Sequence, residues 1–283
     1  MHKNRITVYS PESQLRHPVQ LLRQMVFDIW QARGLAWRLA VRDISAQYRQ
    51  TFLGLGWSVI MPIVNTIVWI FLQGSGIINL SETDLPYPVY VFTGTMLWQI
   101  FVEAFQSPNR QFNQAKAMLS KLNFPRESII LSGILQTMFN ASIKIIILIP
   151  ALLFFGIYPD WSIFFLPVGI FSLILTGTAL GLLLVPIGAL YQDVTRAIPL
   201  VTQVGMYITP VVFPLPKGGL AAILFSINPL TPLILTSRDW LTGVAPSRLD
   251  YFFMINGLMV VIFLIGWIFY RITMPILIER MNA

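Results

Sequence analysis

The sequence predicts an all-α integral membrane protein with six transmembrane helices, an N-terminal interfacial amphipathic helix and an outer re-entrant hairpin. Hydrophobic residues make up 55% of the 283 positions, charged residues only 11%, and the mean hydropathy is +0.69. A chain of this composition cannot cover a globular surface with polar side chains, so its apolar excess must face lipid. Apolar runs near the 20 or so residues that cross a hydrocarbon core also recur along the chain.

The chain opens with a polar, basic cytoplasmic arm, residues 1–54, which contains eight Lys or Arg. A secretory signal would instead place an apolar core directly after a few basic residues, so we expect that this arm is not a cleaved signal. Within the arm an apolar stripe recurs at helical spacing: Trp30, Trp37, Val41, Ile44 and Tyr48. A second stripe lies about 100° around the same helix and consists of Arg38, Arg42, Ser45 and Arg49.

These two stripes predict a helix that lies on the inner membrane face. The apolar stripe would enter the acyl boundary of the membrane lipids. The arginines would meet phosphate head groups or an acidic partner.

Six apolar segments follow and form a predicted membrane domain over residues 55–274. The predicted spans are residues 55–78, 89–105, 129–157, 163–190, 198–212 and 252–274. Residues 275–283 would form a cytoplasmic tail. An even number of spans places both termini on one side of the membrane. The segments on that side hold 15 Lys or Arg, against three in the outer loops, namely Lys217, Arg238 and Arg248. The positive-inside rule therefore predicts that both termini are cytoplasmic.

Two connecting segments carry further helical signals. On the inner side, Ser107 can cap a helix and Pro108 can occupy its first position; one face of that helix would hold Phe112, Ala115, Leu119 and Leu122, and it would stop near Pro125. On the outer side, residues 220–227 and 230–235 are short apolar pieces broken by an Asn-Pro dipeptide. They predict a re-entrant helical hairpin, with a surface loop as the alternative.

The sequence also excludes several functional classes. The dipeptide Gly-Lys is absent, so the chain has no Gly-rich loop running into Lys-Ser or Lys-Thr to cradle phosphates. The predicted spans contain Glu103 and no Asp, which argues against proton or sodium coupling. With no cysteine, and with both histidines in the N-terminal arm, neither a metal site nor a catalytic residue is predicted.

One inner segment identifies a family. It reads Tyr48-Arg49-Gln50-Thr51-Phe52-Leu53-Gly54 and is followed by Trp57 and Pro62. This segment resembles the permease subunits of polysaccharide-exporting ABC transporters, the type 2 exporters that serve O-antigen, capsule and teichoic acid export. Agreement extends to the basic arm, the six-span layout, the stretch Tyr191-Gln192-Asp193-Val194 and the outer stretch Asn228-Pro229-Leu230-Thr231-Pro232.

The resemblance implies a homodimer with twelve spans around a central channel, docked on two copies of a separate ATPase subunit. ATP and Mg would be bound by that subunit, so this chain would carry no cofactor and no enzyme activity. The cargo would be a lipid-linked polysaccharide, moved across the bacterial cytoplasmic (inner) membrane, and no nucleic-acid partner is expected.

Two other functions are alternatives. An ABC exporter of a drug or a small lipid would share the architecture but have a different lumen. A membrane-embedded glycan transferase would need carboxylates or histidines gathered at one membrane face. The outer side holds no His, and its carboxylates are scattered at Glu82, Asp84, Asp160, Asp239 and Asp250.

The candidate substrate path begins with an aromatic stripe on the second span. Its residues share one helix face, in the order Tyr87, Tyr90, Gly94, Trp98, Phe101 and Phe105. Such a stripe can pack against neighbouring spans, or part of it can face a channel where sugar rings stack on aromatic rings. If packing explains the stripe, the path is expected on the first and fifth spans, around Trp69 and Tyr207.

Lys144 and an inner charge cluster complete the candidate sites. Lys144 lies roughly 22 Å above the inner end of the third span, at 1.5 Å per residue. We expect Lys144 at a channel or subunit interface; the alternative is a structural lysine that reaches the outer interface. Glu103 is not expected to be its partner, because the predicted second span places Glu103 near the inner edge. Contact with the ATPase is expected through five residues: Arg38, Arg42, Arg49, Asp193 and Arg196. For Asp193 and Arg196 the alternative is an ordinary short polar loop.

Overall fold

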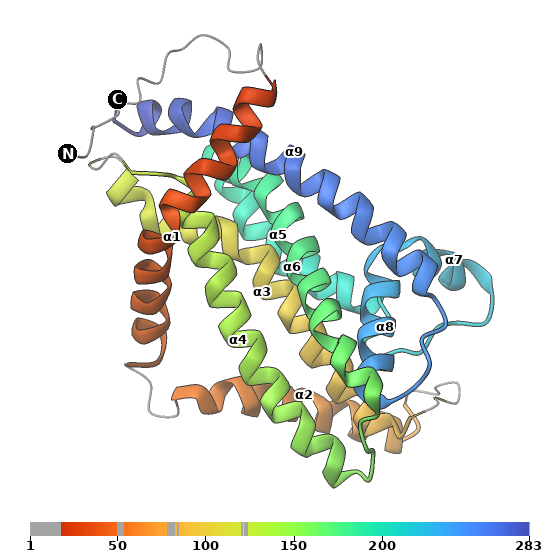
Figure 1. The fold of residues 1–283 in the computed structure, drawn as a ribbon. Helices are drawn as coiled ribbons and strands as arrows, with labels where there is room; N and C mark the ends of the chain where they lie inside the picture. Colours follow the sequence, from red (N-terminus) through yellow and green to blue (C-terminus); the bar gives the residue numbers. More distant parts are fainter. Residues whose placement is uncertain are drawn as a thin grey trace.

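The regular elements of the structure, a computed structural model, are all helical within the residues it describes, which are 18–49, 54–77, 83, 85–119, 121 and 124–282. The all-α class is therefore confirmed for this part of the chain (Figure 1). In chain order the elements are α1 (Pro18–Arg49), η2 (Gly54–Gly56), α2 (Trp57–Gly74), α3 (Tyr87–Leu119), α4 (Glu127–Phe154), η3 (Trp161–Phe165), α5 (Leu166–Leu190), α6 (Gln192–Tyr207), α7 (Gly219–Ile227), α8 (Leu230–Thr242) and α9 (Leu249–Asn282).

Helix α5 lies at the centre of the bundle, with α3 against one side and α9 against another (Figure 1). Helix α4 packs between α3 and α1, and α2 crosses α3 and α4 at a steep angle. Small residues permit the closest of these approaches. A Cβ at Gly177 of α5 would lie 2.6 Å from the Ala104 Cβ and 2.7 Å from the Phe101 carbonyl oxygen. The α3–α5 contact therefore depends on glycine, as is common where membrane helices pack backbone to backbone.

Three helices of the described chain are long and apolar enough to cross a membrane. They cover Glu127–Phe154, Trp161–Leu190 and Leu249–Glu279, and the pair α7–α8, bent by 81° at its break, could count as a fourth span. The apolar part of α2 covers only Ile60–Gly74, about 22 Å at 1.5 Å per residue. The predicted number of six spans thus stays a prediction.

The predicted separate inner helix that begins at Ser107 is wrong. Residues 87–119 form the single helix α3, with Pro108 inside it, where a separate inner helix capped by Ser107 was expected. Proline removes one backbone donor and usually ends or kinks a helix. Here its ring packs against α5, because a Cβ at Gly181 would meet the Pro108 Cγ at 3.0 Å. Ser107 is 2% exposed and sits inside the bundle, so it caps nothing.

The outer segment forms two short helices, as its apolar pieces predict. The break falls at Asn228, whose side-chain amide donates to the Ile208 carbonyl at 2.9 Å and to Thr209 Oγ1 at 2.8 Å. Its Oδ1 accepts from the Leu230 backbone N–H at 2.9 Å, which starts α8. The second piece is longer than expected, since α8 continues to Thr242. Whether the hairpin re-enters the membrane stays a prediction.

Helix α1 packs on α4 through a face of small and aliphatic side chains. That buried face consists of Leu21, Met25, Ala32, Ala36, Leu39 and Ala40. The predicted apolar stripe lies elsewhere, because Trp30 is 64% exposed and Trp37 is 62% exposed. Trp30, Trp37 and Val41 are therefore left uncovered by the protein, whereas Ile44 and Tyr48 are partly buried. Contact of the stripe with lipid stays a prediction.

Candidate functional site

Lys144 of α4 forms an ion pair with Glu103 of α3, with 2.5 Å between Lys144 Nζ and Glu103 Oε1. The prediction that Glu103 is not the partner of Lys144 is wrong. It rested on ending the second span at residue 105, whereas Glu103 lies 16 residues before the end of α3 and Lys144 lies 17 residues after the start of α4. The two helices run antiparallel, so equal distances from these neighbouring ends put both side chains at one depth.

A polar seam continues from this pair along the α3–α4 interface. On α4, Gln136, Asn140 and Lys144 recur every fourth residue and so share one face. Gln136 Oε1 accepts from Gln111 Nε2 at 2.8 Å and from Arg110 Nη2 at 3.1 Å. The last turn of α1 reaches the same seam through Tyr48, whose hydroxyl donates to Asn140 Oδ1 at 3.0 Å. The spacing of four residues was a signal available in the sequence.

A second ionic cluster joins α1, α4 and α9. Arg271 Nη2 lies 2.7 Å from Asp28 Oδ2, and Arg271 Nη1 lies 2.6 Å from Glu127 Oε1. The Arg271 and Glu127 side chains are only 8% and 7% exposed. Proteins tolerate buried charges when the charges are paired and hydrogen-bonded, as they are here. The cluster therefore fastens the N-terminal helix to the membrane helices.

Arg238, expected in an outer loop, is 2% exposed inside the bundle. Its guanidinium carbon lies 3.8 Å from the centre of the Tyr90 ring, a cation–π contact. Its Nη2 donates to the Val211 carbonyl at 3.1 Å, and its Nε donates to Thr93 Oγ1 at 3.3 Å. Gly94 makes room for this arrangement, because a Cβ there would overlap both the Arg238 Nη2 and the Val211 carbonyl oxygen. Arg238 thus ties α8 to α3 and to the segment after α6.

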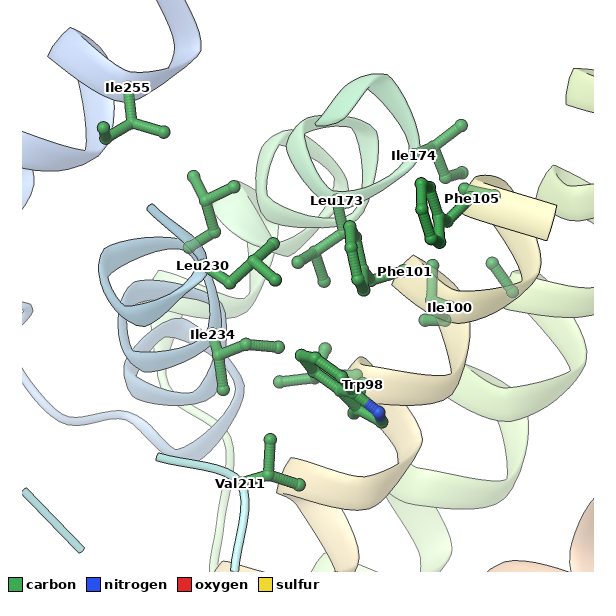
Figure 2. Close-up of a cluster of buried hydrophobic side chains, with 14 of the residues drawn as sticks. Trp98, Ile100, Phe101, Phe105, Leu173, Ile174, Val211, Leu230, Ile234 and Ile255 are labelled. Carbon is green, nitrogen blue, oxygen red and sulfur yellow. The ribbon is translucent and has the colours of Figure 1, made fainter. Parts of the chain in front are cut away.

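The aromatic stripe of α3 is packed inside the protein. Tyr87, Tyr90, Trp98, Phe101 and Phe105 are exposed by 6%, 7%, 5%, 4% and 7%. Figure 2 shows Trp98, Phe101 and Phe105 among Leu173 and Ile174 of α5 and Leu230 and Ile234 of α8. The Phe101 and Phe105 rings stack with centroids 5.9 Å apart. Packing therefore accounts for this stripe in the structure, and its contact with a substrate stays a prediction.

The two aromatic residues expected on the first and fifth spans come together. The ring centroids of Trp69 in α2 and Tyr207 in α6 lie 6.2 Å apart, and Trp69 also contacts Phe213 at 5.4 Å. Tyr207 is 41% exposed. Both helices leave apolar side chains uncovered, among them Met61, Val64, Ile67, Val68 and Phe71 on α2 and Leu200, Val201 and Val204 on α6. The surface around Trp69 and Tyr207 is thus a broad apolar face.

The residues predicted to contact an ATPase lie at the surface. Arg38, Arg42 and Arg49 are exposed on α1, and Arg42 pairs with Asp43 at 2.8 Å. Asp193 and Arg196 are exposed on the first turns of α6, which begins directly after Tyr191. An acidic side chain in a first turn complements the helix dipole, which is the local reason for Asp193. Docking of a partner on these residues stays a prediction.

Three carboxylates of the described residues serve as ion-pair partners between helices. Glu103, Glu127 and Asp28 each face a cation from another helix. Within the described ranges, no group of three or more His, Cys, Asp or Glu could hold a metal ion. The ion pairs of Glu103, Glu127 and Asp28 therefore hold helices together.

Comparison with known proteins places these features in a family. Residues 35–241 match the ABC-2 type transporter family. The O-antigen export system permease protein RfbA of Myxococcus xanthus is 22% identical over 215 residues, covering 75% of this chain and 81% of that protein. The polysialic acid transport protein KpsM of Escherichia coli is 23% identical over 209 residues, covering 71% of this chain and 78% of that protein. Because the family match spans well over half of its length, the chain belongs to the ABC-2 type transporter family and is a multi-pass membrane protein.

Proposed function

We propose that this chain is the permease subunit of an ATP-driven exporter that moves a lipid-linked polysaccharide outward across the bacterial cytoplasmic membrane. The observation that carries the proposal is the family match over residues 35–241. Its support is that relatives over more than two thirds of the chain are named for O-antigen export and for polysialic acid transport, two different glycans. No comparable observation favours a drug or small-lipid cargo.

The proposed topology has six spans: α2, α3, α4, η3 with α5, α6 and α9. The α7–α8 hairpin then re-enters on the outer side, and both termini are cytoplasmic. The excess of basic residues on the inner segments supports this orientation. The Asp28–Arg271–Glu127 cluster is consistent with it, because it joins α1, the start of α4 and the last part of α9 at one end of the bundle.

The proposed assembly is a homodimer on two copies of a separate ATPase subunit. The apolar face around Trp69 and Tyr207 supports contact with a second copy, because α2 and α6 are uncovered there within one protomer. Arg38, Arg42, Arg49, Asp193 and Arg196 are the candidate contacts to the ATPase. ATP and Mg belong to that partner, since this chain lacks a phosphate-cradling Gly-Lys loop.

Deletion of the gene tests the function. We expect loss of surface polysaccharide, accumulation of lipid-linked glycan inside the cell, and recovery of both phenotypes by the intact chain. Normal surface polysaccharide in the deletion strain would contradict the proposal. Increased sensitivity to a drug, without a glycan defect, would instead indicate the drug-exporter alternative.

A further inference from the structure

One stripe of α3 is polar and only partly covered. Every residue from 89 to 98 is buried, but further along the helix four polar side chains are not. They recur at steps of four, three and four, and so share one face; we call Gln99, Glu103, Gln106 and Arg110 the polar lane. Between residues 99 and 112 the one other residue that is not buried is Val102. The lane extends about 16 Å along the helix at 1.5 Å per residue.

The polar lane lies away from the α3 face that packs on α5. That packed face carries Ala104 and Phe105, which approach Gly177 and Gly181. One edge of the lane adjoins α4, where Glu103 pairs with Lys144 and Arg110 donates to Gln136. Toward the end of α3 the stripe continues into the exposed residues Asn113 and Gln114. The lane therefore runs from the middle of α3 toward the end that meets the start of α4.

The side chains of the lane have unused hydrogen-bonding capacity. Within the described part of the chain, the carboxamides of Gln99 and Gln106 have no hydrogen-bond partner. Three buried polar atoms beside them also lack one: Glu103 Oε2, Ser107 Oγ and Arg110 Nε. Buried polar groups are normally satisfied by protein or by water, and polar residues in membrane helices face water or the bundle interior. A lipid-facing position does not suit this stripe.

We propose that the polar lane is a hydrated surface that binds the hydroxyl groups of the glycan as it passes through the inner half of the membrane. This inference rests on the proposed function. A carboxamide offers two donors and one acceptor oxygen, so Gln99 and Gln106 can each exchange hydrogen bonds with sugar hydroxyls. Glu103 adds an acceptor and Arg110 adds donors at either side of Gln106. The chemistry fits a neutral or weakly charged, hydroxyl-rich polymer better than an apolar drug.

Thiol labelling tests the hydration of the lane. The chain has no cysteine, so a single substitution supplies the only thiol. A charged, membrane-impermeant reagent reacts with the thiolate, which requires water at the site. The test variants are Gln99→Cys and Gln106→Cys. Ile146→Cys is the lipid-facing control, because Ile146 is 68% exposed two residues from Lys144, and Ala104→Cys is the buried control, at 0% exposed.

In inside-out vesicles containing the chain with its ATPase, both lane variants should react about tenfold faster than the two controls, since their thiols can ionise in water. Rates equal to that of Ile146→Cys would overturn the proposal. A direct disulfide between two copies of Gln106→Cys, together with slow labelling, would also overturn it, because the lane would then be covered by a second protomer. Neither result would affect the outcome of the gene-deletion test, which tests the proposed function independently.

A second experiment tests whether the glycan binds in the lane. Labelling of Gln106→Cys is compared in two strains that carry an inactive ATPase, one making the lipid-linked glycan and one unable to make it. Several-fold slower labelling in the strain that makes glycan supports binding in the lane. Equal labelling in the two strains, with fast reaction in both, would show a hydrated lane that the glycan does not occupy and would overturn the assignment.

Discussion

The Lys144 ammonium and the Glu103 carboxylate meet 2.5 Å apart at the middle of two antiparallel helices, with the lysine 3% exposed and the glutamate 28% exposed. This unequal burial predicts unequal effects of removing one partner. Glu103→Gln leaves a nearly buried lysine unpaired, at a cost of about 3–5 kcal/mol. Lys144→Met leaves a carboxylate that can still reach water, so it should cost less. Thermal unfolding of the purified variants in detergent measures both.

The double variant Lys144→Met with Glu103→Leu is the control for the ion pair. Replacing both partners by apolar groups removes the unpaired charge, so the double variant should recover most of the stability lost by Glu103→Gln. A double variant less stable than both single variants would show that the stability comes mainly from the ion pair itself, and that the unpaired charge is not the main cause of the loss in Glu103→Gln.

Arg271→Gln should release α1 from the bundle. It removes the cation shared by Asp28 and Glu127, and it leaves the more buried carboxylate, Glu127, without a partner. Limited proteolysis of the α1–α2 connection should then become several-fold faster while α3 to α9 stay protected. Asp28→Asn is the milder matched variant, because the Asp28 side chain is 24% exposed. Unchanged proteolysis in Arg271→Gln would show that apolar packing alone holds α1.

Gly94→Ala should destabilise the contact between α3, α8 and the segment after α6. Its Cβ would overlap the Val211 carbonyl oxygen, a backbone atom, as well as the Arg238 side chain. Overpacking of this kind costs about 1–3 kcal/mol. Gly257→Ala on α9 is the control, since a Cβ there meets nothing within 4 Å. Equal unfolding temperatures for the two variants would contradict the close approach at Gly94.

Trp98→Ala should lower export through loss of stability. Trp98 is 5% exposed and packs against Phe101, with ring centroids 5.1 Å apart. Removing a buried aromatic side chain costs about 3–5 kcal/mol. Phe171→Ala, at a residue 58% exposed on α5, is the control and should be tolerated. Export that falls in Trp98→Ala while protein level and unfolding temperature stay unchanged would instead support a channel-facing role for the stripe.

Hydropathy and helical periodicity predict much of this fold. The helical class, the paired outer helices and the continuous apolar segments of α4, α5 and α9 follow from local pattern, because apolar length and spacing decide them. The predicted break at Ser107 and Pro108 failed for a tertiary reason. Packing of Pro108 beside Gly181 on α5 lets α3 continue, and no local signal reports on that contact.

The charged contacts were the least predictable part of the candidate site. The partner of Lys144 depends on the depth of Glu103, which shifted when α3 proved to continue to Leu119. Arg238 was expected in a loop because charged side chains usually lie at the surface. Inside the bundle its guanidinium instead contacts a ring, a hydroxyl and a carbonyl, while its Nη1 has no hydrogen-bond partner among the described residues. Aromatic periodicity located one face of α3 correctly, but burial on that face comes from α5 and α8, which are distant in sequence.

Transport by reconstituted vesicles tests the central claim most directly. Inside-out proteoliposomes containing this chain and its ATPase partner receive lipid-linked glycan and ATP, and the fraction of glycan protected from an added glycosidase is measured over time. We predict ATP-dependent protection that requires both proteins, with no ATP hydrolysis by this chain alone. Protection that develops equally without the chain, or nucleotide hydrolysis by the isolated chain, would contradict its assignment as the permease subunit of a polysaccharide exporter.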